Sequence, residues 1–203
     1  MRAMSLNQPV RVALLLALVP AIAGGCGGSS DNKSSSNASG SSPAALSADA
    51  KSAATGDIPD NQNFLVYKGA AFSIKYPEGW SQTKSANGID FKDKNNLVRV
   101  AVHKGSAPTA ASVSAELKKL KASQPSLKAQ APKQINLKAG PAIKVTYTTT
   151  SAPNPVTGKR VVLMVDRYEL AKKGRVAVID LGTPTGVDNV DAYRLMSESF
   201  TWL

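Results

Sequence analysis

The residues of this sequence that could do nucleophilic or acid–base chemistry are few. His103 is the only histidine in 203 residues, and Ser106 and Asp90 lie near it in the chain. A general base needs an orienting partner and a nucleophile close to it in space, which proximity in the chain does not supply. We therefore expect His103 to lie at the end of a strand and not to act as a catalytic base.

The C-terminal third carries the densest group of acidic residues, at Asp166, Glu169 and Asp180. Paired carboxylates could do acid–base work or bind calcium. A hairpin that pairs residue 170 with residue 175 would place Asp166 and Asp180 on opposite faces of a sheet, near Arg167 and Arg175. We therefore expect surface ion pairs at these acids and no active site.

Cysteine and motif content narrow the chemistry further. Cys26 is the only cysteine, which excludes a disulfide within the chain and a cysteine-ligated metal site. No EF-hand loop, P-loop, dinucleotide fingerprint or nucleophile elbow occurs in the sequence. We expect no enzyme activity, no cofactor and no metal site, so that Cys26 is the one functional residue that the sequence points to.

The N-terminal segment has the layout of an export signal. Arg2 and Arg11 are basic, residues 12–19 are apolar, and residues 21–25 are small. Eight apolar residues span about 12 Å as a helix, which is too short for a hydrocarbon layer of roughly 30 Å. The segment therefore predicts export and no permanent transmembrane helix.

Residues 23–26, Ala-Gly-Gly-Cys, resemble the lipobox of bacterial lipoproteins, with Ala23 where leucine is usual. The resemblance implies cleavage before Cys26 and a diacylglyceryl group on its thiol, which would anchor the protein on the extracytoplasmic side of the cell membrane. An ordinary secretory signal with a cysteine near its cleavage site is the alternative.

Three regions follow from composition. Residues 1–25 are the expected signal peptide, and residues 26–57 are the lipidated cysteine and a tether rich in Gly, Ser and Ala. The tether cannot bury enough apolar area to offset its ordering entropy, so we expect it to be disordered, with ends about 30 Å apart. All aromatic residues lie from Phe64 onward, so residues 58–203 form the one globular domain.

The domain alternates strand and helix patterns. Alternating or continuous apolar patterns predict strands at residues 71–76, 88–92, 97–103, 143–149, 161–165 and 176–179. Residues 76–79 suit a type I turn, and residues 171–174 suit a hairpin loop. Helices are expected at residues 112–121, capped by Ser112, and from Asp188 through residue 198. This order predicts an α+β domain with an antiparallel sheet sandwiched between helices.

Four segments carry a family resemblance: residues 67–69 (Tyr-Lys-Gly), 72–80 with the sequence YPEGW at their end, 98–102, and 199–202. Together with the order of elements they resemble the PsbP/Mog1-like domain, and the layout is similar to actinobacterial lipoproteins of the LpqN type. The resemblance implies a sheet between helices, in agreement with the patterns above. Fold does not fix function, and no functional residue is carried over.

The charge distribution is uneven, with a formal net charge of +11 and no acidic residue in residues 117–165. That stretch holds Lys118, Lys119, Lys121, Lys128, Lys133, Lys138, Lys144, Lys159 and Arg160. A field of this sign attracts polyanions or anionic headgroups. A lysine-rich surface that only aids solubility is the alternative. The stretch lacks interleaved aromatics, so we expect no nucleic-acid partner.

These observations predict a monomeric, non-catalytic binding or accessory module that docks on an envelope protein or an anionic envelope component. The alternative is a carrier of a lipid or small apolar ligand, with a groove lined by Tyr76, Trp80, Tyr168 and Trp202. Aromatic residues in a small domain more often form its core. A carrier also needs a cavity of about 300 Å³ or more, which a structure can test.

Overall fold

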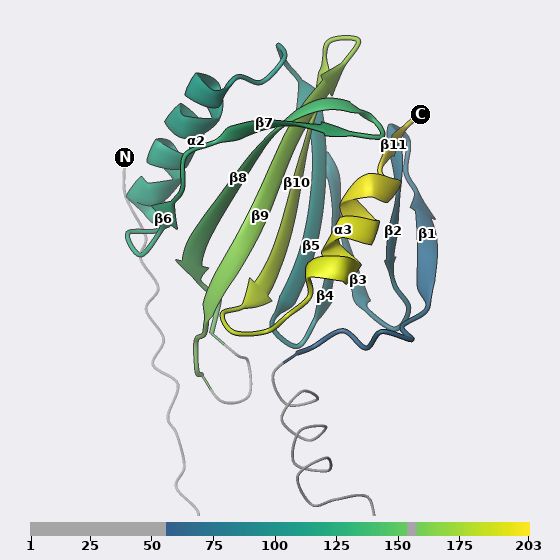
Figure 1. The fold of residues 1–203 in the computed structure, drawn as a ribbon, viewed down its shortest axis with the longest axis vertical. Coiled ribbons are helices and arrows are strands. Elements are labelled where there is room, and N and C mark those ends of the chain that lie inside the picture. Colours follow the sequence, from purple (N-terminus) through teal and green to yellow (C-terminus); the bar gives the residue numbers. More distant parts are fainter. Residues whose placement is uncertain (1–55, 154–157) are drawn as a thin grey trace, which may run out of the picture. The chain divides into compact units, whose positions relative to one another are not determined.

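The computed structural model describes residues 56–153 and 158–203 (Figure 1). The expected signal peptide, Cys26 and almost all of the tether lie outside these residues. No helix in the described ranges is long and apolar enough to cross a membrane.

The larger sheet is antiparallel and has the strand order β3-β4-β5-β10-β9-β8-β6, with β7 also paired to β8. Its strands are β3 (Ser81–Ser85), β4 (Gly88–Asp93), β5 (Asn96–Lys104), β6 (Lys128–Ala129), β7 (Lys133–Leu137), β8 (Gly140–Thr150), β9 (Val162–Lys172) and β10 (Arg175–Pro184). β6 and β7 pair with successive parts of β8, so both lie at the sheet edge opposite β3. The smaller sheet has the order β1-β2-β11, with β1 (Phe64–Lys68), β2 (Phe72–Pro77) and β11 (Thr201–Trp202).

Two apolar clusters cover opposite faces of the larger sheet. Leu163 and Val165 of β9 belong to the cluster that packs against helix α2 (Ala110–Ser123). Tyr168 and Leu170, at alternate positions of the same strand, belong to the larger cluster with helix α3 (Val190–Ser199) and the smaller sheet. Successive side chains of a strand point to opposite faces, so the sheet lies between α2 and α3 (Figure 1). The expected α+β sandwich is confirmed, and the smaller sheet adds to it.

Several boundaries differ from expectation. α2 begins earlier, because Thr109 is its N-cap and Ser112 is the third helical residue of the capping box. α3 has Asn189 as its N-cap, and Asp188 only accepts a hydrogen bond from the Val190 amide at 3.3 Å. β1, β3, β6 and β7 were not expected.

Two turns also differ in detail. Gly79 has φ = 87° and the Trp80 amide donates to the Pro77 carbonyl at 3.4 Å. A positive φ belongs at the third position of a type II turn, so the turn begins at Pro77 and is not type I. In the β9–β10 hairpin, Lys173 and Gly174 both have positive φ and form a two-residue turn. The expected four-residue loop was therefore too long.

Candidate binding surface

The basic stretch of the sequence folds into a cluster of exposed lysines at one edge of the larger sheet. We call this cluster the basic edge: Lys118, Lys119, Lys121, Lys128 and Lys133. The first three lie on α2, and the others lie on β6 and β7 (Figure 1). None of the five forms an ion pair with a described residue. Their charges are therefore available to a ligand.

Two other lysines of the stretch are neutralised within the domain. Lys138 lies 3.4 Å from Glu198, and Lys144 lies 2.7 Å from Asp166. Up to Lys144, the lysines of the predicted basic stretch (residues 117–165) that have no acidic partner among the described residues therefore lie on α2, β6 and the start of β7.

α2 packs on the sheet through one buried side and leaves its three lysines exposed. Val113 and Leu117, one turn apart, are buried against β8 and β9. At the N-terminus the Thr109 hydroxyl accepts from the Ser112 amide at 3.1 Å, and the Ser112 hydroxyl accepts from the Thr109 amide at 2.9 Å. Lys121 lies in the last turn, where a cation interacts favourably with the helix dipole.

A groove of about 400 Å³ separates α2 from the β6–β7 segment. Its walls are mostly apolar and come from Leu117, Leu127, Ala129, Ala131 and Pro132. Lys118 and Lys121, three residues apart on α2, also line it. The basic edge thus combines cations with apolar surface.

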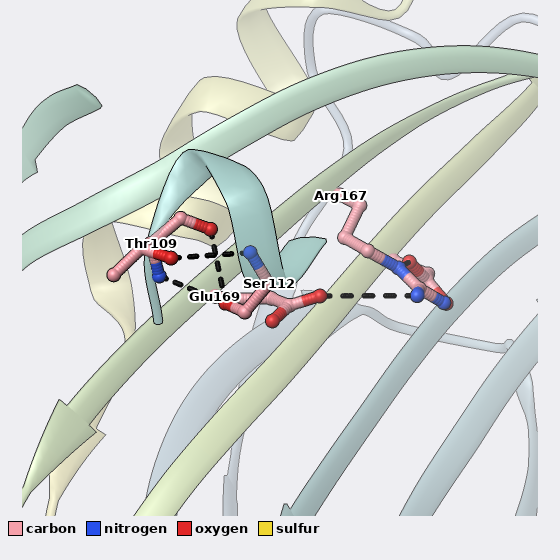
Figure 2. A network of polar contacts seen from close by, with 5 residues as sticks. Thr109, Ser112, Arg167 and Glu169 are labelled. Atoms are coloured by element: carbon pink, nitrogen blue, oxygen red, sulfur yellow. Dashed lines mark hydrogen bonds and ion pairs between the residues drawn. The ribbon is translucent and has the colours of Figure 1, made fainter. Parts of the chain in front are cut away.

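The sheet beneath α2 carries a buried ionic network. Arg167 donates to both carboxylate oxygens of Asp180, at 2.7 and 2.9 Å. It also lies 3.9 Å from Glu169 (Figure 2). Asp180 and Glu169 are 2% and 1% exposed. The expectation of surface ion pairs is therefore wrong for these two acids, because both carboxylates are buried in the folded domain.

The cost of burying the Glu169 carboxyl group is only partly offset, because its Oε1 atom has no hydrogen-bond partner among the described residues. Its pKa is raised to about 7, by burial first and by Glu116 of α2 second, against the lowering effect of Arg167. Figure 2 shows its ion pair with Arg167 together with the Thr109–Ser112 capping box of α2. The contact between α2 and the sheet therefore contains a carboxyl group that is close to half-protonated at neutral pH.

A second groove, of about 390 Å³, lies on the other face of the sheet between α3 and strands β7 to β9. We call it the α3 groove. Ile135, Leu137 and Val187 are among its apolar lining residues, and the Lys144–Asp166 ion pair also lines it. Met164 and Val190 in its lining are 39% and 65% exposed. This groove exceeds the volume that the carrier hypothesis requires.

The aromatic residues expected to line a groove do so only in part. Tyr168 lines the α3 groove. Tyr76, Trp80 and Trp202 are buried in the larger apolar cluster and line none of the grooves described above. Part of the apolar wall comes instead from β7, whose Ile135 and Leu137 alternate with polar residues over only five positions. That short alternation was the one sequence signal for this wall.

The candidate chemical residues do not converge. His103 is exposed near the end of β5, and no hydrogen bond joins it to Ser106 or Asp90. Asp90 instead pairs with Arg99 at 2.8 Å. In the described ranges no three His, Cys, Asp or Glu side chains are arranged to hold a metal ion.

The β9–β10 register places Arg167 opposite Asp180 and Asp166 opposite Leu181. The expected register was wrong by two residues because the turn is shorter. A shift of two preserves the faces, so Asp166 and Asp180 do lie on opposite faces of the sheet. Arg175 neutralises neither acid, since its guanidinium donates to the Leu203 carbonyl at 2.9 Å and lies over the Trp202 ring.

Comparison of the sequence with known protein families and with curated proteins finds no match. Comparison of the structure finds similar solved structures. Cyanobacterial PsbP (CyanoP) from Synechocystis is 14% identical, with a TM-score of 0.53 over 72% of this chain and 98% of that chain. Saccharomyces cerevisiae Mog1p, a Ran-binding protein, is 11% identical, with a TM-score of 0.48 over 69% and 95%. LpqN of Mycobacterium tuberculosis, involved in cell envelope biogenesis, is 14% identical, with a TM-score of 0.41 over 81% and 99%. The likeness to CyanoP is one of fold alone, and it confirms that the domain has the PsbP/Mog1-like fold expected from the sequence.

Proposed function

We propose that this chain is a lipoprotein anchored through Cys26 on the extracytoplasmic side of the cell membrane, and that its domain is a non-catalytic module that binds an anionic component of the cell envelope. The anchor is supported by the layout of residues 1–26. The binding activity is supported by one structural observation: the basic edge presents five exposed lysines without an acidic partner in the described part of the chain.

Charge arrangement supports binding more strongly than net charge does. A lysine-rich surface that only keeps a protein soluble needs no particular layout. Here Lys138 and Lys144 are neutralised, while the lysines of α2, β6 and the start of β7 are not. Five lysines without an acidic partner in the described part of the chain therefore lie on neighbouring segments, α2, β6 and the start of β7, which fits an extended anionic ligand.

The anchor can be tested by fractionation of cells. Replacement of Cys26 by serine removes the thiol that would be acylated, so we expect the mature protein to move from the membrane fraction to the soluble fraction. Unchanged sedimentation of the Cys26→Ser protein with membranes would contradict the proposed anchor.

The binding activity can be tested with immobilised mature protein and an envelope extract. Neutralisation of Lys118, Lys121 and Lys128 by glutamine should remove most of the captured anionic material. The matched control neutralises Lys75, Lys84 and Lys172, which are also exposed lysines and change the net charge equally. Equal capture by the two triple variants would refute the assignment to the basic edge.

A second candidate function is the carriage of a lipid or small apolar ligand, and the α3 groove is the observation that favours it. Its volume of about 390 Å³ and its exposed Met164 and Val190 suit an apolar occupant.

For this second candidate we expect native mass spectrometry of protein purified without detergent to show an added ligand mass. Val190→Glu places a charge in the groove and should abolish the adduct. Leu195→Glu is the control, because Leu195 is an exposed apolar residue of the same helix that does not line the groove. A ligand-free mass for the unaltered protein would remove the carrier function.

A further inference from the structure

Strand β1 forms one edge of the smaller sheet and has β2 as its only neighbouring strand (Figure 1). Its sequence is Phe-Leu-Val-Tyr-Lys, so four of its five residues are apolar or aromatic. Leu65 and Val66 are exposed to solvent. The unpaired amides and carbonyls of such an edge attract another strand, and proteins usually protect the edge with charges, proline or shortness.

The other described edge strands carry that protection. β3 contains no apolar residue, and β6 and β11 have two residues each. β7 has polar side chains at three of its five positions, beginning with Lys133. β1 is neither short nor polar, and its one charge, Lys68, stands at its end. This contrast indicates that β1 is an edge available for pairing.

The register of the β1–β2 hairpin determines which backbone groups of β1 are free. The Gly69 amide donates to the Phe72 carbonyl at 2.9 Å, which makes these two residues a hydrogen-bonded pair. Hydrogen-bonded pairs alternate along an antiparallel ladder, so the odd-numbered residues of β1 bond to β2. The even-numbered residues, Phe64, Val66 and Lys68, therefore direct their amides and carbonyls to the open edge. In the described part of the chain no loop or side chain bonds to these groups.

A second copy of β1 fits this edge. Antiparallel pairing centred on Val66 is the register that aligns the whole strand with its equivalent, and it joins every free amide of β1 to a free carbonyl of the other copy. Val66 would face its own equivalent, Leu65 would face Tyr67, and Phe64 would face Lys68. The two exposed apolar side chains thus gain apolar or aromatic neighbours, and no like charges stand opposite each other.

Charges at the two ends of β1 complement each other in this arrangement. Lys68 forms no ion pair with a described residue. At the other end of the strand, Phe64 lines a pocket together with Asp60, Asp188 and Asp191. Only Asp191 of these three acids has an ion pair among the described residues, with Arg194. Antiparallel pairing places the unpaired cation of each copy beside Phe64 of the other, and so toward unpaired acids.

We propose that β1 pairs with β1 of a second copy about a two-fold axis at Val66, which joins the two smaller sheets into one. The monomer expected from the sequence took no account of this edge, since β1 was not among the expected strands. An edge of five residues buries little area, so we expect a weak, reversible dimer with a dissociation constant of about 100 µM. The pairing involves no residue of the basic edge and does not depend on the proposed function.

The experiment uses the chain from residue 26 with Cys26→Ser, so that no acyl chain contributes. Association is measured by sedimentation equilibrium between about 10 µM and about 1 mM, a range that brackets the expected dissociation constant. We expect a monomer–dimer equilibrium. Deuterium exchange at the Val66 and Lys68 amides should slow about fivefold at about 1 mM, where roughly four fifths of the chains are dimeric.

Three substitutions of Val66 separate the contact from the fold. Val66→Pro removes an amide that bonds only across the dimer, and an edge strand tolerates proline, so dimerisation should weaken more than about tenfold. Val66→Glu keeps the amide but opposes two like charges at the two-fold axis, and should weaken dimerisation about tenfold even if the proline variant folds poorly. Val66→Thr is the matched control, since it keeps the amide and the β-branched shape, and should change the dissociation constant less than about threefold.

The other outcomes overturn the proposal. A single species of monomer mass at every concentration would overturn it and leave this edge to a strand of a different protein. Dimers in which the Val66 and Lys68 amides exchange as fast as in the monomer would overturn the placement of the contact at β1. Equal dissociation constants for the glutamate and threonine variants would overturn that placement as well.

Discussion

Replacement of Asp180 by alanine is expected to lower the free energy of unfolding by about 3–5 kcal/mol. Asp180 accepts two hydrogen bonds from Arg167, and both side chains are nearly enclosed, at 3% and 13% exposed. Without the carboxylate, the guanidinium remains buried beside Glu169, whose nearest oxygen is 3.9 Å away. A buried charge without its partner is costly because water cannot solvate it.

Asp90→Ala is the matched control, because Asp90 makes the same two-bond contact with Arg99 across neighbouring strands. Arg99 is 47% exposed, so water replaces the lost partner and the expected loss is below about 1 kcal/mol. Urea unfolding of the two variants measures the difference. Equal losses would show that burial does not determine the strength of these pairs.

The second large effect concerns pH and Glu169. We expect the free energy of unfolding to be about 2–3 kcal/mol lower at pH 8 than at pH 5, and Glu169→Gln to remove most of that loss. The pKa of Glu169 rises from 4.5 to about 7 in the folded protein, through burial first and Glu116 second. Its neutral form is therefore favoured on folding. The stabilisation is complete below about pH 4.5 and is lost as the pH rises through about 7.

Glu198→Gln is the control for the pH experiment, since Glu198 is half-exposed and pairs with Lys138 at 3.4 Å. Among the described groups whose pKa is strongly shifted, only Glu169 has a folded value between pH 5 and 8. Unfolding curves measured at several pH values test the prediction. A flat profile for the unaltered protein, or an unchanged slope in Glu169→Gln, would contradict it.

The helices and strands that could be predicted from the sequence are those with one apolar face packed in the core and one face exposed to solvent. The apolar spacing of Val113 and Leu117 located α2, and the alternation of Phe72, Ile74 and Tyr76 located β2. By contrast, β3 (Ser81–Ser85) is exposed along its whole length. An edge strand without a buried face shows no alternation, so the pattern that identifies other strands is absent there.

The sequence predicted that the candidate binding surface is positively charged, but it did not predict which lysines stay unpaired or where the grooves lie. The acid-free stretch indicated a positive surface, but the pairing of Lys138 with Glu198 and of Lys144 with Asp166 depends on contacts distant in the chain. Both grooves depend on segments that were not expected as strands: β6 and the turn into β7 for one, and β7 for the other. The burial of Glu169 likewise depends on where α2 packs. Such tertiary effects leave no local trace in the sequence.

The most direct test of the central claim is the affinity of the mature chain for isolated cell envelope at low and at high salt. If the basic edge binds an anionic component, raising the salt from about 50 to about 500 mM should weaken binding at least tenfold, because screening lengths shorten severalfold over that range. The triple glutamine variant at Lys118, Lys121 and Lys128 should bind weakly at both salt concentrations. Binding that is equally tight at both, in the unaltered chain and in the variant alike, would contradict the account.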